Sequence, residues 1–150
     1  MKRVPAVFTI LICILFSTGY ATPLADTPQD TLKEKKNLAV NFVRLVNTAE
    51  MNYRHDEGRY GTFADLVKSS ELQKVSARFP QFASVLQRIN SQSESEPIAG
   101  LQFGLVLAGD GTKYKLSVRE KQDKPGCGFA FFSDEIGLIF EGKVIDCPAQ

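Results

Sequence analysis

The sequence predicts an α+β fold in which a long N-terminal helix packs on a four-stranded antiparallel β-sheet, with one or two short helices between them. Three observations predict it. Apolar residues first recur at helical spacing through residues 30–55, a segment without Pro or Gly. From Gly100 onward the apolar period changes to two, which is typical of strands. Turn-forming residues then divide the second half into two consecutive hairpins, so the strands are expected to be antiparallel.

The chain opens with the layout of a secretory signal peptide. Lys2 and Arg3 precede an uncharged apolar run at residues 6–16, and small residues stand at the −3 and −1 positions if cleavage follows Ala21. An apolar run of this length is too short to span a bilayer comfortably. We therefore expect an exported protein, periplasmic or extracellular, without a transmembrane segment once the signal is removed.

This interpretation divides the chain into a signal peptide at residues 1–21, a flexible, proline-containing lead-in at 22–30, and a single domain at 31–150. Loss of Lys2 and Arg3 lowers the formal net charge from +1 to −1. A nearly neutral protein has no general electrostatic attraction to nucleic acid or to anionic membranes. No nucleic-acid partner is therefore expected.

The long helix is bounded by recognisable end signals. Thr27 and Pro28 suit an N-cap and a first turn, and Gly58 suits a stop. One apolar stripe runs along the helix between them. The stripe consists of Leu38, Phe42, Leu45, Val46, Ala49 and Tyr53.

Two short helices and four strands are expected after the long helix. The first short helix, at residues 63–72, follows a Thr62–Asp65 capping box, and the second, at residues 81–89, follows a proline. Lys113, Lys115 and Arg119 alternate with apolar residues and should line a solvated outer face of the sheet. The expected strands are residues 101–107, 113–119, 128–132 and 136–140, with turns at 108–112 and 133–135.

The cysteines fit an oxidising compartment. Cys13 leaves with the signal peptide, and Cys127 and Cys147 are then expected to form one disulfide, which stabilises by about 3 kcal/mol in the chain-entropy model. The alternatives are two free thiols or half of a metal site. The wide spacing and the absence of a nearby histidine do not suit zinc.

Two stretches of the chain resemble type IV pilins and pseudopilins. The resemblance covers roughly residues 38–66 and 101–140. The first stretch is similar to the helix-to-loop passage of short bacterial pilin-like proteins and reads Asn47-Thr48-Ala49-Glu50, then Tyr53, Gly58, Tyr60, Gly61, Phe63 and Leu66. The second is similar to their last hairpin and reads Phe131-Phe132-Ser133-Asp134-Glu135-Ile136-Gly137-Leu138-Ile139.

The resemblance implies a pilin-like arrangement of the helix and the sheet in residues 31–150. Pilins also carry a prepilin peptidase site, a Gly followed by Phe and then an acidic residue, which opens a long apolar helix. This chain has no such motif, and its first helix begins with charged residues. The resemblance therefore implies a free, secreted, pilin-like head domain without the segment that stacks into a filament core.

No motif in the sequence predicts a catalytic, cofactor-binding or metal-ligating residue. His55 lies at the end of the long helix, where a basic residue caps carbonyl groups, and it lacks a positioned partner. The Ser133-Asp134-Glu135 segment has no nucleophile elbow and no EF-hand spacing, so it is interpreted as a turn. Residues 109–111, Gly-Asp-Gly, lack a phosphate-loop ending and are interpreted as a hairpin turn.

A second, thinner stripe on the long helix gives a candidate partner surface at Val40, Val43 and Met51, with Asn47 among them. Either the lead-in or the 81–89 helix covers this stripe, or it binds a partner. The resemblance favours a partner there, because neighbouring subunits of pilin-like proteins pack on the helix face away from the sheet.

Two functions from different classes follow. The first is a non-enzymatic interaction or structural module that binds a protein or a cell-surface component. The second is a small secreted hydrolase that uses scattered carboxylates, for which Asp56, Glu57, Asp134 and Glu135 are the candidates. No cofactor is expected for either.

Overall fold

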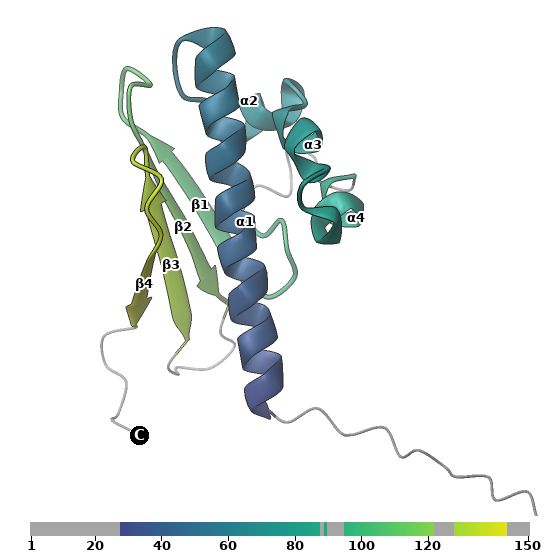
Figure 1. Cartoon of the computed structure of the whole chain (residues 1–150). Helices are drawn as coiled ribbons and strands as arrows, with labels where there is room; N and C mark the ends of the chain where they lie inside the picture. The colour runs from purple at the N-terminus through teal and green to yellow at the C-terminus, as the bar shows by residue number, and fades with distance from the viewer. Residues whose placement is uncertain (1–27, 88, 90–94, 122–127, 144–150) are drawn as a thin grey trace, which may run out of the picture.

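The computed structural model describes residues 28–87, 89, 95–121 and 128–143. They form an α+β fold in which the N-terminal helix packs on a four-stranded antiparallel sheet, with short helices between them in the chain, as predicted (Figure 1). The predicted signal peptide, most of the lead-in, and Cys127 and Cys147 lie outside the described residues.

The long helix α1 runs over Pro28–Glu57. It begins at a proline, whose fixed backbone angle suits the first helical turn. It ends at Gly58, which has a positive φ of 75° and donates its N–H to the carbonyl of Arg54 at 2.9 Å. The predicted helix at residues 30–55 is confirmed and is slightly longer at both ends.

The short helices differ in number from the prediction. The Thr62–Asp65 capping box is present at the start of α2. The single helix predicted at residues 63–72 is wrong, because Ser70 adopts a left-handed conformation with φ 64° and separates two helices. The segment after Pro80 begins with a 3₁₀ turn and ends earlier than predicted. The observed elements are α2 (Phe63–Lys68), α3 (Glu71–Ser76), η1 (Pro80–Phe82) and α4 (Ala83–Leu86).

The sheet is a meander with the strand order β1-β2-β3-β4. Its strands are β1 (Leu101–Leu107), β2 (Tyr114–Glu120), β3 (Phe129–Asp134) and β4 (Phe140–Lys143). The first three confirm the predicted strands within two residues at each end. The predicted fourth strand is present, but it begins at Phe140 and not at residue 136, because a turn and a short irregular segment precede it. Gly137, with φ 80°, donates its N–H to the carbonyl of Asp134 at 2.9 Å and closes the turn.

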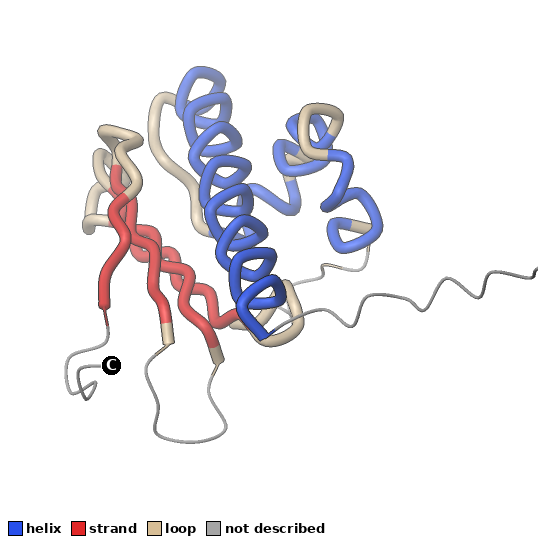
Figure 2. Tube along the Cα trace, turned by 60° about the horizontal axis from the view of Figure 1, so that its bottom comes forward, coloured by secondary structure: helices blue, strands red, loops and turns tan. Residues whose placement is uncertain are grey.

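All described helices lie on one face of the sheet, and α1 lies between that face and the short helices (Figures 1 and 2). Phe42 joins the layers: its ring centroid lies 5.5 Å from that of Phe82 in η1 and 5.5 Å from that of Phe103 in β1. Phe63 of α2 lies 4.7 Å from the same Phe103 ring. The core is therefore one continuous cluster shared by the sheet, α1 and the short helices.

Candidate interaction surface

The outer face of the sheet, which points away from the helices, has no described element over it (Figure 2). The alternation of burial in β2 and β3 defines the two faces. Leu116 and Phe131 are buried toward the helices, whereas Lys115 and Phe132 are exposed on the opposite side. The prediction that Lys115 and its neighbour Arg119 face solvent is confirmed.

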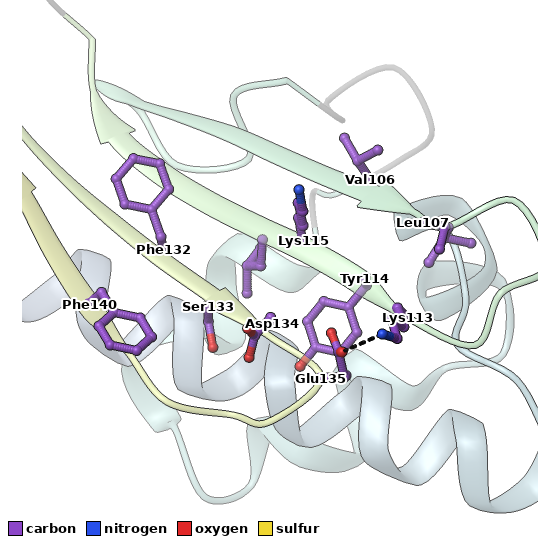
Figure 3. A pocket seen from close by; sticks show the side chains of 12 residues that line it. Val106, Leu107, Lys113, Tyr114, Lys115, Phe132, Ser133, Asp134, Glu135 and Phe140 are labelled. Atoms are coloured by element: carbon purple, nitrogen blue, oxygen red, sulfur yellow. Dashed lines mark ion pairs between the residues drawn. The ribbon is translucent and has the colours of Figure 1, made fainter.

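Apolar side chains stand on this outer face. Phe132 is 46% exposed and Phe140 is 56% exposed, although both are large aromatic residues, and Val106 is 66% exposed. Phe132 and Phe140 are register partners of β3 and β4, so they lie side by side on one face (Figure 3). Ile136 and Leu138 extend the apolar character into the β3–β4 turn, and both are also exposed. An apolar group of this kind is typical of a contact surface.

A shallow hollow of about 640 Å³ lies among these residues (Figure 3). Its lining comes from β1, β2, β3, the β1–β2 hairpin and the start of β4. Charged groups stand at one end, where Lys113 Nζ lies 4.0 Å from Glu135 Oε1. Lys115 and Asp134 also line the hollow and are register partners across β2 and β3. The surface is therefore apolar at its centre and carries both signs of charge at one end.

A buried chain of hydrogen bonds supports the outer face from below. The Tyr114 hydroxyl donates to Asn47 Oδ1 at 2.9 Å, Asn47 Nδ2 donates to Ser133 Oγ at 2.8 Å, and the Ser133 hydroxyl donates to the Leu138 carbonyl at 2.8 Å. The chain links β2, α1, β3 and the β3–β4 turn. The prediction that Ser133 belongs to a turn is wrong, because it lies in β3 with its side chain buried in this chain of bonds.

Replacing Tyr114 by phenylalanine is expected to lower the free energy of unfolding by about 1–3 kcal/mol. The variant leaves the buried Asn47 Oδ1 without the hydrogen bond that the Tyr114 hydroxyl donates. Urea unfolding measures this change. Tyr53→Phe is the control. The Tyr53 hydroxyl accepts a long bond of 3.3 Å from the exposed Arg59, which water can solvate, so the loss of stability should be smaller. Equal losses in the two variants would contradict the importance of the Tyr114–Asn47 bond.

The helix-to-loop passage contains a second buried polar group, Glu50, which is fully buried on α1. Its Oε2 accepts the N–H of Gly61 at 2.9 Å, and its Oε1 has no hydrogen-bond partner among the described residues. Burial, with a further contribution from the charge of Asp65, raises the pKa of Glu50 to about 7, against the lowering effects of the Gly61 N–H and of Arg59. A side chain at Gly61 would collide with the Tyr53 ring, so the loop backbone lies directly against α1.

The candidate surface predicted on α1 is only partly accessible. Val43 is fully buried, Val40 is half-buried, and Met51 is 53% exposed. The second stripe faces the sheet: Val40 lines a groove with Phe131, and Asn47 bonds to β2 and β3. The sheet therefore covers part of this stripe, and most of the lead-in lies outside the described residues. Met51 alone offers a substantially exposed side chain.

The carboxylates considered for a hydrolase do not line one pocket. Asp134 and Glu135 line the outer-face hollow, whereas Asp56 and Glu57 are exposed at the end of α1 and are not among its lining residues. His55 is exposed on the same helix end. Among the described residues no group of three or more His, Cys, Asp or Glu side chains is placed to hold a metal ion.

The exposed aromatic pair, Phe132 and Phe140, is the feature of this surface that the sequence did not indicate. Phe131, Phe132 and Phe140 are equally apolar, and the period of two shows which of them share a face but not which face the helices cover.

Comparison of the chain with protein-family models, with curated proteins and with solved structures finds no match. Within the described part of the chain, no helix combines the length and hydrophobicity needed to cross a bilayer.

Proposed function

We propose that this chain is a non-enzymatic, exported, pilin-like domain that acts as an interaction or structural module in the bacterial periplasm or outside the cell. The observation that carries the proposal is the apolar outer sheet face, centred on Phe132 and Phe140, which remains exposed while the opposite face packs against the helices. The signal-peptide layout of residues 1–21 supports export.

The contacts made by the segments that resemble pilins support the same proposal. Asn47 and Glu50 are the buried polar residues of the Asn47–Glu50 segment. Asn47 bonds to the sheet, and Glu50 bonds to Gly61 of the following loop. The residues that carry the resemblance thus join α1 to the loop and to the sheet. This is expected if these segments pack together as they do in pilin-like proteins. A domain of this kind would bind through its sheet face rather than through an apolar helix extension.

Export and binding are tested together in bacterial cells with the full chain carrying a C-terminal tag. A photo-cross-linking phenylalanine analogue replaces Phe140, and the matched control carries it at Gln73, which is exposed on α3 away from the sheet. We expect a processed chain that begins near Thr22, and a specific protein adduct from position 140 only. An unprocessed cytoplasmic chain, or the same adduct pattern from both positions, would refute the proposal.

A further inference from the structure

One row of residues on the outer sheet face is small on two strands and large on the other two. This row of register partners crosses all four strands: Gly104, Ser117, Phe132 and Phe140. The first two, on β1 and β2, are small. The last two, on β3 and β4, are large aromatic residues, and the Phe132 ring lies over Gly142, where a Cβ atom would come within 2.7 Å of it. Along this row the face therefore rises from β1–β2 to β3–β4.

The neighbouring row is complementary in charge. Lys115 of β2 is the register partner of Asp134 of β3, so a cation and an anion stand on opposite sides of the line between these strands. Among the described residues Lys115 forms no ion pair, whereas its neighbour Lys113 lies 4.0 Å from Glu135. In both rows the change occurs between β2 and β3. Side chains pass from small to large in one row, and from positive to negative in the other.

We propose that this face binds the same face of a second copy of the chain, around a two-fold axis that runs parallel to the strands between β2 and β3. The inference rests on the proposed function as an interaction module and names its partner. Such an axis exchanges β2 with β3 and β1 with β4. Because register partners lie at the same height along the strands, Phe132 of one copy then lies over Ser117 of the other, and Phe140 lies over Gly104.

The same axis places Lys115 of each copy over Asp134 of the other. The contact is isologous, so this charge pair and the two aromatic contacts each occur twice. Stacked sheets lie about 10 Å apart, and they pack well where large side chains of one face meet small ones of the other. An axis that runs along β3 itself would instead stack Phe132 on its own copy and Asp134 on its own copy, which is unfavourable in both volume and charge.

The size of the face predicts a weak dimer. Four strands spaced about 4.8 Å apart and a few residues long give a contact that buries on the order of 1,000 Å² in total, at the low end for specific interfaces. The dimer should therefore depend on concentration, with a Kd on the order of micromolar to tens of micromolar. Aromatic residues near the centre of the contact are the expected source of its affinity.

A charge-swap series tests the geometry in solution. Sedimentation velocity is run on the full chain as the cell produces it, from about 1 µM to about 1 mM, a range that brackets such a Kd. Lys115→Glu and Asp134→Lys should each raise the Kd at least about tenfold, because each one brings like charges together twice. The double variant should return the Kd to within about threefold of the original, because each copy again presents opposite charges.

Two further variants separate association from folding. Ser117→Phe puts a large side chain among the small residues of the row, at a position where an aromatic residue suits a strand, and it should abolish the dimer while the thermal unfolding temperature of the monomer is kept. Lys68→Glu reverses a charge on α2, which lies over the opposite face of the sheet, and should leave the Kd unchanged. Thermal unfolding near about 0.1 µM, well below the expected Kd, measures how far the swaps lower the stability of the monomer itself.

The outcomes distinguish this inference from the proposed function. A chain that stays monomeric throughout, or a dimer on which Lys115→Glu and Lys68→Glu act alike, overturns the inference. A cross-link from position 140 to a different protein in cells also overturns it, while the proposed function stands. Rescue by the double variant, together with loss of the dimer in Ser117→Phe, supports the two-fold contact whether or not the cell-based test succeeds.

Discussion

Replacing Phe42 by alanine is expected to lower the free energy of unfolding by about 3–5 kcal/mol, the largest single effect in the chain. Phe42 is 1% exposed and lies at the meeting point of α1, the short helices and the sheet. Its ring contacts Phe82 on one side and Phe103 on the other, so alanine leaves a cavity that borders both layers. A domain of this size is stable by only about 5–15 kcal/mol, so the loss is a large part of the total.

Urea unfolding, followed by circular dichroism, measures the loss as a shift of the midpoint. The matched control is Phe140→Ala, at a residue that is 56% exposed on the outer sheet face, studied at low concentration so that self-association does not contribute. Its free energy of unfolding should change by less than about 1 kcal/mol. If both variants lost similar stability, the assignment of Phe42 to the core and of Phe140 to an interaction surface would be wrong.

The sequence predicted the helix and three of the strands because each has a single clear period. The fourth strand begins later than predicted for a local reason. Ile136, Leu138 and Ile139 suggest a strand by composition, but Gly137 adopts a positive φ and bonds back to Asp134, which turns the chain before β4 begins. A run of apolar residues indicates burial or pairing, and here the turn leaves Ile136 73% exposed.

The α1 helix shows why burial was underestimated from the sequence. A helix that packs on one layer buries one stripe, and the sequence predicted one core stripe for that reason. In the structure α1 has the sheet on one side and the short helices on another, so the buried arc also includes Val43, Asn47 and Glu50. A pattern of apolar residues cannot predict that the polar residues in this arc are buried, although their hydrogen bonds join the layers.

The Glu50 carboxyl is expected to make the protein less stable as the pH rises from about 4.5 to about 7. Burial raises the pKa of Glu50 in the folded chain from 4.5 to about 7. Over this range the folded chain keeps the proton that the unfolded chain has released, so unfolding releases a proton and rising pH favours it. The contribution is fully present below pH 4.5 and is lost through pH 7, with a total of about 3 kcal/mol.

Charged and titratable groups from three elements face this site. Arg59 lies in the loop after α1, Asp65 lies on α2, and Tyr114 approaches from β2 and senses the Glu50 charge. Asp65 has the opposite sign of dependence, because the backbone N–H of Thr62 holds its pKa below the ordinary value. Its stabilising contribution is lost as the pH falls through that lowered pKa, so the effects of the two carboxyls occupy different pH ranges.

Urea unfolding at a series of pH values from about 4 to about 8 measures the dependence. Glu50→Gln should flatten the curve between pH 4.5 and 7 and make the protein more stable than the original chain at pH 8, because a neutral amide can still accept the Gly61 N–H without a buried charge. Asp65→Asn should leave this part of the curve in place. His55, the single histidine, is replaced by Gln in every background so that its ionisation does not contribute. A slope that survives in Glu50→Gln would show that another group binds the proton and would refute the assignment to Glu50.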